Sequence, residues 1–194
     1  MTTFNHLRNI IQSRRSTKPA VMNGKKIDTS LIHQLLELAD WAPTHGTTEP
    51  WRFIVYANTA IQKFCFGHAE LYKNNTAADK FTKAKYEKLL HMGNTVSHII
   101  LVYMKRSEGN SIPPEEEFAA VAAAVQNILL GAASLDIAVL WSTGGMAHHP
   151  AMKNYLGIAA EDAILGLLYL GYTNEPLKEG KRNIPLADKI DWRS

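Results

Sequence analysis

Hydrophobic residues recur at helical spacing in some segments of the chain and form short unbroken runs in others. Helical spacing predicts an amphipathic helix that ends at residues 14–18, a second from Asp28 or Thr29 to near Trp41, and others over about 59–69, 78–92 and 149–156. Apolar runs predict buried strands at 52–57, 96–104, 137–141 and 163–172. Because the helices outnumber the strands and do not alternate regularly with them, we expect an α+β fold.

The longest apolar stretch, residues 118–141, predicts a buried helix followed by a strand. Three glutamates at 115–117 fall in the first turn of this helix, where carboxylates complement the helix dipole. Up to Gly131 the helix is apolar nearly all round, so we expect it at the centre of the domain or in a subunit interface. Polar residues interrupt the stretch and argue against a membrane span: Gln126, Asn127, Ser134 and Asp136.

The composition is that of a globular protein, with 46% hydrophobic and 20% charged residues among 194. This length fits a single domain over residues 1–194. The net charge of +3 is too small to indicate nucleic-acid binding. The single cysteine, Cys65, excludes an internal disulfide, and the N-terminus lacks a secretory pattern, so we expect a cytoplasmic protein in which Cys65 is a small buried hydrophobic residue.

Arg14-Arg15-Ser16-Thr17-Lys18 places three cations and two hydroxyls at the end of the first predicted helix. A helix C-terminus favours cations through its dipole, so charge compensation alone would explain two basic residues. It does not explain the hydroxyls between them. Guanidinium groups beside a hydroxyl and an ammonium suit a phosphomonoester and an electron-rich heterocycle held together. This segment is therefore a candidate anion site, with charge compensation as the alternative.

Two further segments place polar groups next to predicted strands. Residues 42–53 join a helix to a strand through two prolines, a glycine, three threonines and His45. They could form a rigid loop with an ordinary surface histidine, or part of a site. Residues 141–145, Trp-Ser-Thr-Gly-Gly, end a core strand where backbone N–H groups and hydroxyls can face a ligand. A simple glycine turn would have the same sequence.

Together these three segments resemble the FMN-dependent nitroreductase family, and most of all its small subgroup, the compact NAD(P)H nitroreductases. Residues 10–18 resemble the family's opening helix with its Arg-x-Ser-x-basic motif. Residues 42–53 resemble its Ala-Pro-…-Pro-Trp-x-Phe segment, and residues 141–144 its Trp-x-Ser/Thr-Gly segment. The resemblance covers nearly the whole chain. It implies a central, mostly antiparallel sheet flanked by helices, and a homodimer with one FMN at each subunit interface.

The resemblance also implies which residues bind FMN. Arg14 and Ser16 would contact the phosphate and the ribityl chain, with Arg15 beside them. Lys18 would lie near N1 and O2 of the isoalloxazine, where a cation stabilises the negative charge of the reduced ring. The remaining implied contacts come from His45 and, through backbone and hydroxyl groups of the dimer-related face, from Trp141, Ser142 and Thr143.

Two implied contacts fit the family pattern less well. Glu49 stands where related sequences carry Gln before Pro-Trp, and a carboxylate cannot donate a hydrogen bond unless it is protonated. Close to the ring, it would lower the flavin potential unless Arg52 or Lys18 neutralised it or it pointed away. Arg182, which follows Lys181, resembles the family's C-terminal basic pair at the phosphate, with a spacing that differs by a residue.

The implied reaction needs no acid, base or nucleophile from the protein, so we expect no catalytic residue. FMN N5 would carry hydride from NADH or NADPH to a nitroaromatic, a quinone or a similar small-molecule acceptor, in a ping-pong cycle through one pocket. A flavin protein with other flavin chemistry, or a redox sensor without turnover, would carry the same binding residues. Purified protein distinguishes these alternatives by its response to NAD(P)H.

Two other classes fit the sequence poorly. An RNA-binding domain would interleave stacking aromatic residues with the cations of 14–18, and none is present there. His148-His149-Pro150 raises the question of a metal site, but adjacent histidines point in different directions and no further ligand follows at a suitable spacing. A role at a helix N-terminus, or as a neighbour of residues that contact a ligand, fits better, and we expect no metal, nucleic-acid or membrane partner.

Overall fold

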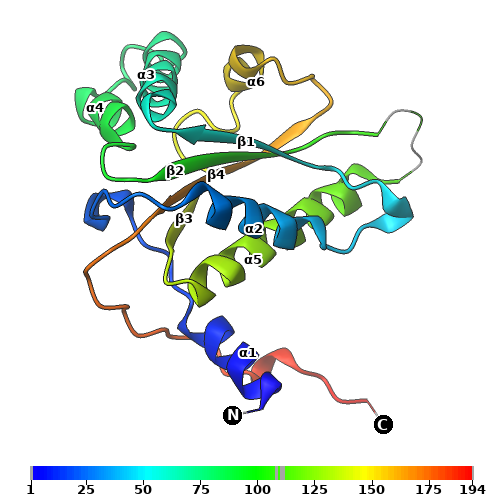
Figure 1. Cartoon of the computed structure of the whole chain (residues 1–194). Coiled ribbons are helices and arrows are strands. Elements are labelled where there is room, and N and C mark those ends of the chain that lie inside the picture. The colour runs from blue at the N-terminus through cyan, green and yellow to red at the C-terminus, as the bar shows by residue number, and fades with distance from the viewer. Residues whose placement is uncertain (1, 108, 110–111, 194) are drawn as a thin grey trace.

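A four-stranded antiparallel sheet separates two layers of helices in the computed structural model, which describes residues 2–107, 109 and 112–193 (Figure 1). The strands are β1 (Trp51–Ala57), β2 (His98–Met104), β3 (Ala138–Ser142) and β4 (Ala163–Gly171), in the spatial order β1-β2-β4-β3. Each neighbouring pair is antiparallel. The predicted α+β class is confirmed, and so is each predicted strand, to within two residues at its ends.

Helices α2 (Thr29–Asp40) and α5 (Pro114–Ser134) cover one face of the sheet, and α3 (Thr59–Asn74), α4 (Lys83–His91) and α6 (Pro150–Leu156) cover the other (Figure 1). Helix α1 (Thr3–Ser13) projects from this body beyond the end of α5. Short 3₁₀ turns occur at Pro19–Val21, His45–Thr47 and Ala187–Lys189. Asp28 begins α2 as predicted, because its carboxylate accepts a hydrogen bond from the Ser30 N–H at 2.8 Å.

The segment between β1 and β2 departs from the prediction. Helix α3 ends five residues later than predicted, and α4 begins five residues later. Thr82 caps α4 by accepting a hydrogen bond from the Lys85 N–H at 3.3 Å, and the Tyr72 hydroxyl accepts one from the Thr82 N–H at 3.0 Å. These bonds fix a turn where the apolar spacing alone favoured a helix.

Helix α5 is the central helix of the fold, as its apolar sequence predicted. Nine of its residues are buried, and the apolar ones among them pack against α2 and the sheet. Gly131 allows α2 to approach closely, because a Cβ there would lie 2.6 Å from Leu38 Cδ1 and 2.9 Å from Leu35 Cδ2. By length and composition alone α5 could cross a membrane, but this burial is that of a core helix.

The last of the three glutamates at the start of α5 has a second role besides complementing the dipole. Glu117 is 1% exposed, and its carboxylate forms an ion pair with the Arg106 guanidinium. The Ser107 hydroxyl donates to the same carboxylate at 3.1 Å. Arg106 also donates to the Ile112 carbonyl at 3.2 Å and, through its backbone N–H, to the Asp162 carboxylate at 2.9 Å. This network anchors the connection between β2 and α5.

Helix α1 and the C-terminal segment expose large apolar side chains. No residue of α1 is buried, and Phe4 is 70% exposed. In the C-terminal segment Leu186 is 70% and Trp192 89% exposed. Both segments lie at the same end of the molecule, beyond the C-terminus of α5 (Figure 1). The apolar face predicted for the first helix is therefore left uncovered by this chain, which is typical of a surface that another molecule covers.

Candidate functional site

The residues that follow α1 run along the free edge of β3. Ser16 pairs with Val139 in a parallel bridge, and the Thr17 N–H donates to the Val139 carbonyl at 3.0 Å. Helix α1 ends here because Arg14 leaves the helical conformation, with φ −54° and ψ 127°. The structure therefore places residues 14–18 beside β3, the strand whose end carries the candidate segment 141–145.

Two cavities flank residues 14–18. One, of about 340 Å³, lies between Arg14 and the C-terminal half of α5, where Leu129 and Ala133 line it. The other, of about 380 Å³, lies between Lys18 and residues 173–178. Because Arg15 and Thr17 line both cavities, the two adjoin each other across this segment. Cations and hydroxyls, together with the acidic residues Asp136 and Glu175, thus line a divided hollow at the sheet edge.

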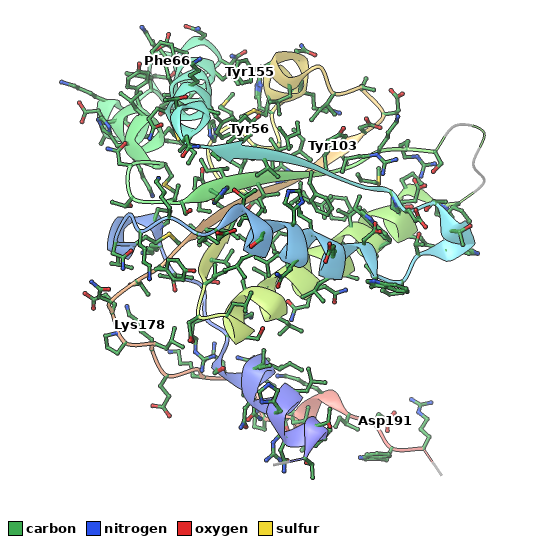
Figure 2. All side chains as sticks on the ribbon, in the orientation of Figure 1. Tyr56, Phe66, Tyr103, Tyr155, Lys178 and Asp191 are labelled. Atoms are coloured by element: carbon green, nitrogen blue, oxygen red, sulfur yellow. The ribbon has the colours of Figure 1, made fainter. Side chains whose placement is uncertain are left out.

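Arg15 uses its guanidinium to hold the backbone of this site together. Its Nε donates to the Lys178 carbonyl at 2.8 Å, and its Nη1 donates to the carbonyls of Gln12 at 2.6 Å and Arg14 at 2.8 Å. Figure 2 places Lys178 on the C-terminal segment near the end of α1. In this structure Arg15 therefore ties the C-terminal segment to the end of α1, and its predicted phosphate contact stays a prediction.

At the end of β3 the backbone and hydroxyl groups are available to a ligand, whereas the Trp141 indole is not. The Trp141 indole N–H donates to the Leu165 carbonyl at 3.2 Å. The ring lies against Gly166, where a Cβ would be 2.9 Å from Trp141 Nε1, so β4 needs a glycine at this position. The Ser142 hydroxyl accepts a hydrogen bond from the Gly144 N–H at 3.3 Å, and Thr143 is exposed.

A buried histidine that the sequence did not indicate holds the loop after β3. His68 of α3 is 2% exposed, and its Nε2 accepts a hydrogen bond from the Met146 N–H at 2.8 Å. Gly145 has φ +70°, and a Cβ there would lie 2.4 Å from His68 Nε2. Burial, with a smaller contribution from the nearby charge of Lys85, lowers the pKa of His68 to about 4. Its partner is 78 residues away in the chain, so no local motif could have found it.

This histidine should make folding stability depend on pH. The pKa of His68 is about 4 in the folded protein, below its ordinary value of 6.5, so its contribution is complete above pH 6.5 and is lost as the pH falls toward 4. We expect wild type to lose roughly 2–3 kcal/mol more unfolding free energy than His68→Gln between pH 7 and pH 4.5, measured by urea unfolding. Glutamine can accept the Met146 hydrogen bond and does not titrate. Equal losses in the two proteins would contradict this assignment.

His45 and Glu49 lie at the other end of the molecule. His45 Nδ1 is 2.6 Å from the carboxylate of Glu116 in the first turn of α5. Glu49 has φ +42°, and its carbonyl accepts a hydrogen bond from Arg52 at 2.9 Å. Within the described residues the Glu49 carboxylate forms no ion pair, either with Arg52 or with Lys18. Its predicted contact with FMN stays a prediction.

The length of α5 separates the two halves of the candidate site. His45 contacts Glu116 near its start, whereas Ala133, which lines the cavity beside Arg14, is near its end. At 1.5 Å per residue this separation is about 25 Å. One chain therefore assembles residues 14–18 with β3 but does not bring His45 to them.

Other predicted residues have local roles. Arg182 is exposed, and its guanidinium donates to the neighbouring Lys181 carbonyl at 3.0 Å, so its phosphate contact also stays a prediction. His149 caps α6 by accepting a hydrogen bond from the Ala151 N–H at 3.2 Å, which confirms its predicted place at a helix N-terminus. Cys65 is buried as predicted, and burial raises the pKa of its thiol to about 11. Among the described residues no three His, Cys, Asp or Glu side chains gather as metal ligands would.

The chain is similar to a curated bacterial relative over most of its length. It is 28% identical over 188 residues to the Bacillus subtilis (strain 168) protein named "Putative NAD(P)H nitroreductase YfhC". That similarity covers 95% of this chain and 92% of the relative.

Solved structures share the fold, and a family model matches the sequence. A nitroreductase-like family protein from Bacillus cereus superimposes with a TM-score of 0.80 at 27% identity, over 100% of this chain and 98% of that one. The FMN-dependent nitroreductase NfnB from Mycobacterium smegmatis, solved in complex with NADPH, superimposes with a TM-score of 0.76 at 12% identity over 100% of both chains. The model of the Nitroreductase family matches residues 11–172. The chain therefore belongs to the nitroreductase family.

Proposed function

We propose that this protein is a cytoplasmic FMN-dependent oxidoreductase that takes hydride from NADH or NADPH and passes it to an electron-poor acceptor such as a nitroaromatic or a quinone. The observation that supports this most directly is the placement of residues 14–18 along the β3 edge between two cavities. When bound, FMN would supply the two-electron chemistry at N5, with donor and acceptor using one pocket in turn.

The residues around these cavities fit the chemistry of FMN. The Arg14 guanidinium and the Ser16 hydroxyl make no hydrogen bond to other side chains or carbonyls in the described part of the chain, so both are available to a phosphate and a ribityl chain. Lys18 lines the second cavity, and its ammonium would stabilise negative charge on the reduced ring. Each cavity alone has a volume within the roughly 300–1,000 Å³ typical of small-molecule sites.

A second copy of the chain would complete the site. His45 lies about 25 Å along α5 from residues 14–18, so a flavin that touches both needs two subunits. The exposed apolar residues of α1 and the C-terminal segment support an interface at the end where residues 14–18 lie. We therefore propose a homodimer with one FMN at each subunit interface, in which one subunit supplies residues 14–18 and the other supplies His45.

The absorbance spectrum of the purified protein tests this function. We expect a yellow protein with flavin absorbance that NAD(P)H bleaches under nitrogen and a nitroarene then restores. A yellow protein that NAD(P)H does not bleach would be a flavin-binding module without this turnover. A protein that remains colourless after incubation with FMN would contradict the proposal.

A further inference from the structure

A third cavity lies on the face of the sheet opposite α5, where α4 meets the loop after β3. Its volume is about 170 Å³, and its lining includes Lys85 and Lys88 of α4 together with Ser142 and Gly145 of the loop. We call this cavity the lysine pocket. Ser142 ends the strand along whose edge residues 14–18 run and is itself one of the predicted FMN contacts, so the lysine pocket and the proposed FMN site share this strand.

The two lysines give the pocket positive charge without a counter-ion. Lys85 and Lys88 are three residues apart and therefore lie on the same side of α4. Within the described residues neither pairs with a carboxylate, whereas Lys83 of the same helix pairs with Glu87 at 3.6 Å. The Lys85 ammonium lies 4.6 Å from the centroid of the Tyr72 ring, but no carboxylate neutralises either lysine, so both can attract an anion that enters the pocket.

The rest of the lining is neutral. Leu89 and Tyr169 are buried apolar residues, and His68 is neutral near pH 7 because burial lowers its pKa. The volume of about 170 Å³ is below the roughly 300–1,000 Å³ of sites that enclose a whole ligand. The pocket can therefore hold the end group of a larger molecule, and two ammonium groups beside an apolar surface suit a carboxylate or a phosphate.

We propose that the lysine pocket binds an anionic substituent of a molecule that exchanges electrons at the flavin. The inference rests on the proposed function and adds a preference: an acceptor or donor that carries a carboxylate or phosphate is favoured over its neutral analogue. Lys85 and Lys88 would be the residues that determine this specificity, with the Ser142 hydroxyl as a further hydrogen-bond donor.

The acceptor is tested with a matched pair, 4-nitrobenzoate and 4-nitrobenzamide, which differ in charge but little in shape. We expect wild type to prefer the nitrobenzoate in kcat/KM, and Lys85→Met/Lys88→Met to lower that preference about tenfold, the effect of losing one charge-assisted hydrogen bond. The control is Lys80→Met/Lys83→Met, which removes two charges from the same surface outside the pocket. It should retain the preference.

The donor is tested by the ratio of kcat/KM for NADPH to that for NADH, since the two nucleotides differ by one phosphate. A ratio that falls in the pocket variant and not in the control identifies the donor phosphate as the bound anion. If both the acceptor preference and the nucleotide ratio are unchanged in the pocket variant, the proposal is overturned. It is also overturned if the variant slows charged and neutral acceptors equally while shifting the flavin potential, because the lysines would then serve the flavin.

Binding without turnover separates this inference from the proposed function. Benzoate cannot be reduced at this site, so its effect on the thermal unfolding midpoint of the FMN-incubated protein reports occupancy of the pocket alone. We expect benzoate to raise the midpoint more than benzamide does, in wild type and in the control but not in Lys85→Met/Lys88→Met. Equal shifts by benzoate and benzamide in wild type would overturn the pocket. Failure to bind FMN would instead remove the proposed function, whatever benzoate does.

Discussion

Replacing Arg14 and Ser16 together by alanine is expected to yield protein that is mostly free of FMN, with a dissociation constant raised roughly 100-fold or more. The variant removes a guanidinium and a hydroxyl that face the cavities, and hydrogen bonds to a charged group contribute about 1.5–3 kcal/mol each. Neither side chain hydrogen-bonds to the protein within the described residues, and the bridge to Val139 uses only the backbone of Ser16. The fold and the subunit contacts should therefore survive.

Fluorescence titration with FMN measures the affinity, and size-exclusion chromatography measures the oligomeric state. Arg8→Ala is the matched control, because Arg8 carries a guanidinium on the helix that precedes Arg14 but lines neither cavity. It should bind FMN as wild type does. Full flavin occupancy in the double variant would show that the phosphate is held elsewhere.

Arg106→Met is expected to lower the free energy of unfolding by about 3–5 kcal/mol, the typical effect of leaving one member of a buried ion pair without its partner. The Glu117 side chain has no exposed surface, so its carboxylate would lose the guanidinium without gaining water. The connection between β2 and α5 would also lose the bonds from Arg106 to the Ile112 carbonyl. Urea unfolding monitored by circular dichroism measures the change.

A second variant separates the buried charge from the loss of packing. Arg106→Met/Glu117→Leu removes both charges and should be more stable than Arg106→Met alone, because no buried carboxylate is left. Lys105→Met, at the neighbouring exposed position, should change stability by less than about 0.5 kcal/mol. A loss below about 1 kcal/mol in Arg106→Met would show that the pair contributes little to stability.

We also expect Arg106→Met to loosen the loop that carries His45. Ile112, whose carbonyl Arg106 holds, lies with its side chain 3.4 Å from the position of a Cβ on Gly46. Gly46 follows His45 in a turn with φ +61°. The buried ion pair thus supports the loop that presents the histidine, although neither of its members lines the proposed flavin cavities.

Most of the fold could be predicted because its helices and strands follow from sequence patterns within short segments. The apolar runs of the four strands and the spacing in α1, α2 and α5 each depend on a few adjacent residues, and the structure confirms them. The predicted start of α4 was wrong because the true start depends on Tyr72, whose hydroxyl accepts a hydrogen bond from the Thr82 N–H ten positions away. The burial of Glu117 was missed for the same reason, since a glutamate in a first turn is usually solvated and only its contact with Arg106 reverses that.

The candidate site was predictable in its parts but not in its assembly. Residues 14–18 could be placed beside β3 only through the bridge between Ser16 and Val139, which no sequence pattern encodes. The distance of His45 from them follows from the direction of α5 across the sheet. His68 gave no sequence signal at all, because a single histidine in an amphipathic helix is as compatible with the surface as with a buried acceptor.

The length of α5 has a genetic consequence. Under the proposed assembly each centre takes its cations from one polypeptide and its imidazole from the other. Consider a mixed dimer in which one subunit is mutated at Arg14 and the other at His45. Both mutations then fall in the same FMN site, and the second FMN site is intact. Two inactive alleles expressed in one cell would then rescue each other, and two alleles damaged at the same end of the helix would not.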